Sequence, residues 1–201
     1  MIGTLEKRPG QATGKLTTDP ITKPEIDVDL LVSLAQNGKT EAFGLLYEKF
    51  MGRIYSYLYL RTGQTGQAED MTQEVFLRAF QGIGNYRCRG IPFPGWLLRI
   101  AHNLVVDFYR KEGKRQIIPL DDAWMPSTDN PETMAELNLD IAEIRKAMTG
   151  LPPAQREAFS LRFVAGLSVS ETAEVMGKSE GAVKTLQHEA VVKLRKMMRE
   201  E

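Results

Sequence analysis

Apolar residues recur along most of the chain at intervals of three and four positions, the spacing of helices that bury one face. In the first half, this spacing predicts a short helix that ends near Asn37, a longer helix from about Thr40, and a third helix over about 67–80. Gly63 and Gly66 are expected to break the chain between the second and third helices. No segment shows the alternation typical of a strand, so the pattern predicts an all-α protein.

A fourth helix is predicted from Gly95 to about Lys111, after an irregular loop that begins at Gly82. Its apolar residues form a wide stripe suited to a core, namely Trp96, Leu97, Ile100, Ala101, Leu104, Val105 and Phe108. The opposite face carries polar groups that suit phosphates and base edges, His102 among them. An ordinary amphipathic helix with a solvated face is the alternative interpretation.

Two stretches lack this helical spacing. Residues 1–26 contain three prolines and few large apolar side chains, so we expect a disordered N-terminal arm. Residues 113–130 are acidic, contain two prolines, and are expected to form a flexible linker. Helical spacing resumes at Pro131, continues to Met148, and returns in further helices up to the C-terminus. The chain is therefore predicted to form two small helical domains joined by an acidic linker.

The distribution of charge adds to this division. The chain is formally neutral, with 26 basic and 26 acidic residues. Residues 41–115 nevertheless carry a net charge of +4, residues 116–140 carry −6, and residues 141–201 carry +2. Random fluctuation along a charged chain is one explanation. The other is that both basic blocks bind nucleic acid, and motifs must decide between the two.

Composition excludes several classes of function. The single cysteine, Cys88, can form no internal disulfide and has no cysteine neighbour for a zinc site. Two histidines, at 102 and 188, and the lack of a glycine-rich phosphate loop provide no catalytic residue, metal site or cofactor site. No apolar run could span a bilayer, and the N-terminus lacks the apolar core of a secretory leader. We therefore expect a cytoplasmic protein that is not an enzyme.

The most specific local motif covers residues 167–194. Ser168 and Glu171 are spaced to form a capping box at the start of one helix. Gly177 stands where that helix should end, and Ser179 can cap the next helix after a short turn. The second helix has one inward apolar stripe, made of Val183, Leu186, Ala190 and Leu194. This pattern predicts a helix-turn-helix.

The outward face of the second helix carries Lys184, Thr185, His188 and Arg195, and these side chains can face a major groove. A helical hairpin with a solvated face is the alternative. Glu189 on this face favours caution, because a carboxylate near phosphates is repelled. The motif thus indicates the fold more strongly than it indicates DNA binding.

Three segments carry a resemblance to a known family: AEDMTQEVFLRAF at 68–80, PGWLLRIAHNLVVDFYRK at 94–111, and the region from LPPAQREAF to VVKL at 151–194. In this order they resemble bacterial RNA polymerase sigma factors of the sigma-70 family, in the extracytoplasmic function (ECF) subfamily. The resemblance implies a sigma region 2 domain over 27–112, a linker over 113–130 and a sigma region 4 domain over 131–201. A protein of this family directs promoter-specific transcription initiation.

The resemblance implies two contacts for region 2. The third helix would bind the clamp of the largest polymerase subunit through Asp70, Gln73, Glu74 and Arg78. The loop from Gly82 and the helix after it would recognise the −10 promoter element as a melted strand, with one base held outside the stack. Asn103 matches a family position near that base, and Phe93 is a candidate for stacking. Trp96 is a second candidate for stacking, although its place in the apolar stripe favours the core. Candidates for contacts with the strand's backbone are Arg87, Arg89, Arg99 and Arg110.

Region 4 would place the helix from Ser179 in the major groove of the −35 element and hold a flap of the polymerase β subunit. The residues implied to contact the −35 DNA are Lys184, Thr185, His188, Glu189 and Arg195, although Glu189 departs from the basic residue common in the family. The linker would lie near the RNA exit path. The implied partners are core RNA polymerase, promoter DNA and an anti-sigma factor of unknown identity.

A second class of function remains open at this point. A two-domain helix-turn-helix regulator could bind duplex DNA through its C-terminal domain and never contact polymerase. Such a protein would leave the match to region 2 unexplained.

Overall fold

The structure is a computed structural model that describes residues 27–88, 90–112 and 145–197. The first domain consists of α1 (Val28–Gln36), α2 (Thr40–Thr62), α3 (Thr65–Gly82), the 3-10 turn η1 (Ile83–Asn85) and α4 (Phe93–Glu112). The second consists of helical residues 145–148, α6 (Pro153–Phe159), the π-helical turn η2 (Ser160–Val164), α7 (Val169–Met176) and α8 (Glu180–Met197). These ranges contain no strand, so the all-α prediction is confirmed. The predicted N-terminal arm and linker lie outside the described residues.

Two predicted boundaries were wrong, and both errors involve the first turn of a helix. Gly66 was expected to break the chain, but it lies in the first turn of α3, which begins at Thr65. Helix α4 begins at Phe93, before the predicted start at Gly95, and includes Pro94. The first backbone N–H groups of a helix have no partner within it, so a proline there costs no hydrogen bond. Gly63 does end α2, in the left-handed conformation with φ of 76°.

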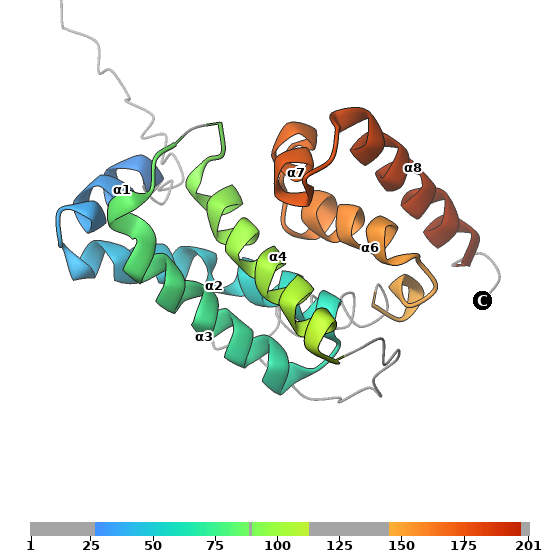
Figure 1. The fold of residues 1–201 in the computed structure, drawn as a ribbon, viewed down its shortest axis with the longest axis horizontal. Coiled ribbons are helices and arrows are strands. Elements are labelled where there is room, and N and C mark those ends of the chain that lie inside the picture. Colours follow the sequence, from blue (N-terminus) through green and yellow to red (C-terminus); the bar gives the residue numbers. More distant parts are fainter. Residues whose placement is uncertain (1–26, 89, 113–144, 198–201) are drawn as a thin grey trace, which may run out of the picture.

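Helix α4 is covered on more sides than the sequence pattern indicates. Its deeply buried side chains are Phe93, Leu97, Leu98, Ala101 and Val105, whereas Trp96, Ile100 and Phe108 are only partly buried against the core. Leu98 was not predicted to be buried. It shares a face of α4 with Gly95 and His102, which both contact the second domain. Figure 1 shows the cause, since α4 lies between the other helices of its domain and α7.

The two domains share their hydrophobic cores. The cluster that fills the first domain also contains Leu161, Ala165, Leu167 and Val175 of the second domain. In the other direction, Leu60 of α2 packs in a separate cluster with Met148, Leu151, Ala190 and Leu194. Full burial of a leucine side chain contributes about 2 kcal/mol. The described domains are therefore held together mainly by apolar burial.

Polar contacts join the same domains at the C-terminal end of α2. The Arg145 guanidinium donates to the Tyr59 hydroxyl at 2.9 Å and lies 5.1 Å from the centre of that ring. Arg61 donates to the carbonyl of Pro153 at 3.4 Å. These contacts fix the second domain against the end of α2.

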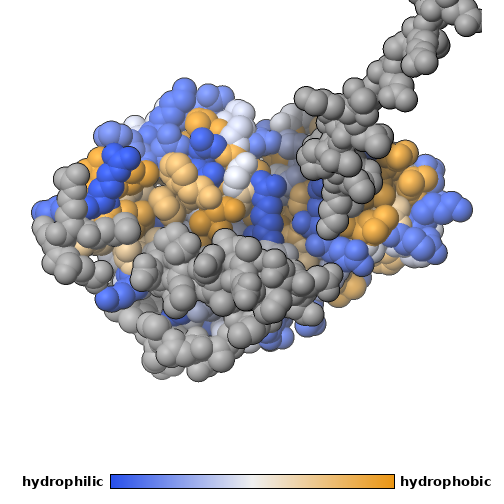
Figure 2. Space-filling view, turned by 180° about the vertical axis from the view of Figure 1, so that it is seen from behind, coloured by the Kyte–Doolittle hydropathy of each residue, from blue (hydrophilic) through white to orange (hydrophobic). Residues whose placement is uncertain are grey.

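Some apolar side chains remain on the surface of both domains, and Figure 2 shows apolar patches between polar side chains toward both ends of the rear face. In the first domain, Leu30 and Leu34 of α1 are exposed. In the second domain, Phe163 and Val192 are exposed. Scattered exposed apolar residues are normal, and these four need no function to explain them.

Replacement of Ser168 tests how much the cap at the start of α7 contributes to the stability of the protein. We expect Ser168→Ala to lower the free energy of unfolding by about 1 kcal/mol, because alanine cannot accept the hydrogen bond from the N–H of Glu171. Urea denaturation followed by circular dichroism would measure this loss. Ser168→Asp retains an acceptor and should lose less, so equal losses in the two variants would contradict the capping role.

Candidate nucleic-acid interface

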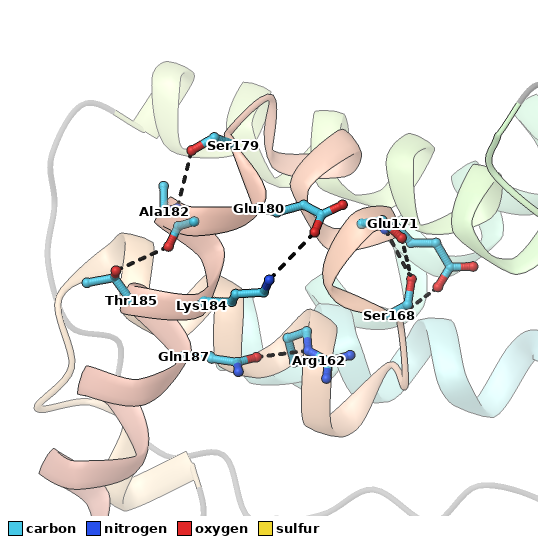
Figure 3. Close-up of polar contacts among 11 residues, drawn as sticks. Arg162, Ser168, Glu171, Ser179, Glu180, Ala182, Lys184, Thr185 and Gln187 are labelled. Atoms are coloured by element: carbon cyan, nitrogen blue, oxygen red, sulfur yellow. Dashed lines mark hydrogen bonds and ion pairs between the residues drawn. The ribbon is translucent and has the colours of Figure 1, made fainter.

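The turn between α7 and α8 has the predicted geometry (Figure 3). The Ser168 hydroxyl accepts from the N–H of Glu171, and the Glu171 carboxylate accepts from the N–H of Ser168, which completes the capping box. Gly177 ends α7 with φ of 62°, a conformation that glycine adopts at least cost. The Ser179 hydroxyl then accepts from the N–H of Ala182 at 3.2 Å and caps α8. The predicted helix-turn-helix is therefore present.

Helix α8 has one buried and one exposed face. Val183, Ala190 and Leu194 are buried, and Leu186 is partly buried. The five predicted DNA-contacting residues are all exposed, and they are Lys184, Thr185, His188, Glu189 and Arg195. Three of them already have contacts inside the domain: Lys184 lies 3.8 Å from Glu180, and the Thr185 hydroxyl donates to the carbonyl of Gly181. The third is Glu189.

The Glu189 carboxylate is oriented by a neighbouring helix. Its Oε2 accepts a hydrogen bond of 2.7 Å from Nε2 of Gln155, which belongs to α6. The acidic side chain at this position is thus held toward its own domain. This contact gives a physical reason why a carboxylate is tolerated on an otherwise polar and basic face.

A contact between distant residues fixes the position of α8, and the sequence analysis did not predict it. Nε of Arg162 donates to Oε1 of Gln187 at 2.9 Å, and the same guanidinium bonds to the carbonyl of Leu167 (Figure 3). Arg162 belongs to η2 and Gln187 to α8. Because the partners are 25 positions apart, no local spacing could indicate the pair.

The loop between α3 and α4 is held in a defined shape by side chains of the first domain. The Tyr86 hydroxyl donates to the carbonyl of Ile91 at 3.1 Å, and the Tyr86 ring packs against Trp96 at 4.9 Å between centroids. Arg87 donates to the carbonyls of Gly84 and Tyr86, so part of this exposed side chain is directed at the loop itself. Phe93, a candidate for stacking on a base, is 1% exposed and belongs to the core instead.

Gln36, at the end of α1, connects this loop to the start of the domain. Its Nε2 donates to the carbonyls of Ile83 at 3.0 Å and of Tyr86 at 2.8 Å. Both carbonyls belong to the segment that carries Arg87. Gln36 is a positioning residue that the sequence analysis missed, since its partners lie 47 and 50 positions away.

The predicted polar face of α4 is partly exposed. Asn103 is exposed, as are Arg99 and Arg110. Each arginine lies near a carboxylate, Arg110 at 3.0 Å from Asp107 and Arg99 at 3.9 Å from Glu174 of α7. Exposed pairs of this kind contribute about 0–1 kcal/mol, so they can exchange their partners. The remaining candidate, Arg89, lies outside the described residues.

His102 does not belong to the exposed face. Its side chain is 14% exposed and pairs with Glu157 of α6, which is 13% exposed. Burial alone would raise the pKa of Glu157, but the hydrogen bond with His102 and the charge of Arg61 outweigh it. The pKa of the Glu157 carboxyl is therefore below its usual value, and the group stays ionised against α4.

A stripe of exposed side chains runs along α3. Asp70, Gln73 and Arg78 are exposed as predicted, and Glu74 is half-buried and bonded to Arg78 at 2.6 Å. The same face carries Leu77 and Phe80, which are 52% and 48% exposed. These apolar residues were missed, although Leu77 follows Gln73 by four positions and Phe80 follows Leu77 by three, which places both on this face. Apolar side chains ringed by polar ones are typical of a protein interface.

Within the described ranges, no cluster of side chains is arranged to hold a metal ion. None of the helices in those ranges has the length and apolar character to cross a membrane.

Known families match both domains. Residues 46–115 match Sigma-70 region 2, and residues 141–194 match Sigma-70 region 4. Over 170 residues the chain is 41% identical to the ECF RNA polymerase sigma factor BldN of Streptomyces coelicolor, which covers 84% of this chain and 64% of that relative. Over 175 residues it is 33% identical to the ECF RNA polymerase sigma factor SigD of Mycobacterium tuberculosis, covering 84% of this chain and 82% of SigD.

A solved structure has the same fold. The structure of CnrH in complex with the cytosolic domain of CnrY aligns with a TM-score of 0.67 and 24% identity, over 87% of this chain and 99% of that one. The two family matches follow the order of the domains, and SigD is matched over most of its length. The chain therefore belongs to the sigma-70 family of RNA polymerase sigma factors, in the ECF subfamily.

Proposed function

We propose that this chain binds core RNA polymerase in the cytoplasm and directs it to promoters that have specific −10 and −35 elements. Residues 27–112 would act as region 2 and residues 131–201 as region 4, with residues 113–130 as the connection. As the family implies, an anti-sigma factor would be a further partner. We assign a binding partner to each surface of the protein from the side chains that are exposed on it.

The stripe on α3 is the observation that supports polymerase binding most directly. Leu77 and Phe80 form an apolar centre, and Asp70, Gln73 and Arg78 surround it with polar groups. A regulator that binds only duplex DNA has no use for such a surface on the domain without the helix-turn-helix. The clamp of the largest subunit is the partner we assign to it.

The loop after α3 and the exposed face of α4 would bind the melted −10 strand. Asn103 has an amide that can both donate to and accept from a base edge. Arg87, Arg99 and Arg110 are exposed and can contact phosphates. Arg89 is assigned the same role from the family match alone.

The exposed face of α8 would read the −35 duplex in its major groove. Lys184 and Arg195 can contact phosphates, and Thr185 and His188 can reach base edges. Glu189, held by Gln155, would accept from a cytosine amine or stay turned away from the DNA.

Transcription with purified components tests the function as a whole. We expect the chain to give initiation at a specific promoter when core polymerase is added, and Leu77→Asp to weaken core binding at least tenfold, since a charge would be buried at the centre of the contact. Leu45→Asp is the matched control, because Leu45 is also exposed but lies on α2. Specific duplex binding without any polymerase-dependent initiation would instead identify a stand-alone regulator.

Two variants separate base contact from loop positioning at the −10 element. Asn103→Ala should weaken binding of a single-stranded −10 oligonucleotide by the holoenzyme about tenfold, the value of one or two lost hydrogen bonds to a base. Gln36→Ala should weaken it less and should also speed amide hydrogen exchange in the loop, because Gln36 contacts only the carbonyls of the loop. Gln81→Ala, at an exposed site nearby, is the control. Unchanged strand affinity in Asn103→Ala would refute its role.

At the −35 element, Lys184→Ala should weaken duplex binding while core polymerase binding stays intact. If Lys184 contacts a phosphate, the variant should also reduce the dependence of log affinity on log salt by about 1. Lys193→Ala, on the same helix, is the control. Loss of core binding in parallel would show that Lys184 has a structural role.

A further inference from the structure

Helix α8 carries two carboxylates, and they have different kinds of partner. Glu180 lies 3.8 Å from the ammonium group of Lys184, so a positive charge offsets its own. Glu189 accepts instead from the side-chain amide of Gln155 at 2.7 Å. An amide has no net charge, so this hydrogen bond orients the Glu189 carboxylate and leaves its negative charge in place. The bond uses Oε2, so Oε1 can accept a further hydrogen bond.

The amide of Gln155 is directed at this carboxylate. Gln155 is half-buried on α6, which packs on α8. Its Oε1 is buried and has no hydrogen-bond partner among the residues that the structure describes. A reversed amide would bring that oxygen against the Glu189 carboxylate, where two acceptors repel each other. The contact with Glu189 therefore determines which way the amide points.

Glu189 lies among the side chains that we propose to read the −35 duplex. It follows Thr185 by four positions and His188 by one, and all three residues are exposed. Residues four positions apart are neighbours on a helix face. Their spacing corresponds to about 6 Å along the helix axis, or about two base-pair steps. Thr185 and Glu189 would therefore reach different base pairs.

We propose that Glu189 determines specificity at one position of the −35 element by accepting a hydrogen bond from the amine of cytosine, and that Gln155 positions the carboxylate for this contact. The inference rests on the proposed role of α8 at the −35 element. A carboxylate can only accept, and the amines in the major groove belong to cytosine and adenine. Adenine presents its N7 acceptor beside the amine and repels a carboxylate, so cytosine is the base that fits.

The negative charge of Glu189 makes this contact selective. A base pair that offers no amine at this position leaves the carboxylate unpaired near phosphates, which is unfavourable. Basic residues outnumber acidic ones on α8, so the helix as a whole still favours DNA. The hydrogen bond from Gln155 keeps one carboxylate oxygen paired when water leaves the interface. Glu189 would thus act mainly by rejecting the wrong base pairs.

Selection from a DNA library tests the contact. Holoenzyme assembled from the full-length chain and core polymerase would bind duplexes with a randomised −35 region, and the bound duplexes would be sequenced. We expect one position to favour cytosine about tenfold, and Glu189→Ala to abolish this preference while other positions keep theirs. Glu189→Arg should shift that position to guanine, because arginine bonds to O6 and N7 of guanine. Glu48→Ala removes the same charge from an exposed site on α2 and should change no preference.

A double-mutant cycle tests the role of Gln155. Gln155→Leu keeps the approximate size of the side chain but cannot donate, so the preference for cytosine should fall about threefold, the value of one hydrogen bond. The same substitution in the Glu189→Ala background should change no base preference, because the residue that Gln155 positions is absent. If Gln155→Leu weakens binding to all sequences equally, with or without Glu189, its role is structural and the positioning role is wrong.

The selection also separates this contact from the function of the chain as a whole. If the holoenzyme selects −35 sequences but no position depends on residue 189, Glu189 is not a specificity determinant and the sigma function stands. If no −35 sequence is selected even with core polymerase present, the assignment of α8 to the −35 element is wrong, and the role of Glu189 falls with it.

Discussion

The burial of α4 on two sides is the constraint on which the rest of the structure depends. One side of the helix packs on α2 and α3, and the other packs on the second domain near Gly95 and His102. A helix with a single buried stripe would leave a broad polar face for a ligand. In this chain, Arg99, Asn103 and Arg110 of that face stay exposed, whereas His102 is covered by the second domain. The packing of the two domains therefore decides how much of the proposed nucleic-acid surface on α4 is exposed.

Apolar burial and ion pairs both contribute to the contact between the two domains, in unequal amounts. Buried leucines supply most of the attraction, at about 2 kcal/mol each, while the exposed pair of Arg99 and Glu174 contributes about 0–1 kcal/mol. Apolar contacts therefore contribute more than this exposed ion pair to the affinity of one domain for the other. The chain as a whole has no net charge, and opposite charges also meet at the domain boundary. There, acidic groups of the second domain lie against the basic face of the first.

What the sequence could predict follows the distance between interacting residues. The capping box of Ser168, the turn at Gly177 and the cap at Ser179 involve neighbours within a few positions, and all three were predicted correctly. The burial of His102 was missed because its partner Glu157 belongs to the other domain, and the spacing of residues within α4 does not indicate it. Leu98 lies on the same side of α4, and its burial was missed as well. The contacts of Gln36 and Arg162 were missed because their partners, although in the same domain, lie 25 or more positions away in the sequence. The exposed face of α8 was predicted because helical geometry alone determines which residues lie opposite a buried stripe.

The role of Gln36 has a consequence for where this domain begins. The match to Sigma-70 region 2 starts at residue 46, inside α2, and so leaves out α1. Yet α1 buries Leu31 and Val32 in the core, and Gln36 at its end supports the loop before α4. A fragment cut at the family boundary would contain every recognisable motif of the domain but would lack the helix that shapes its loop. The helices that form the domain therefore extend beyond the residues that match the family.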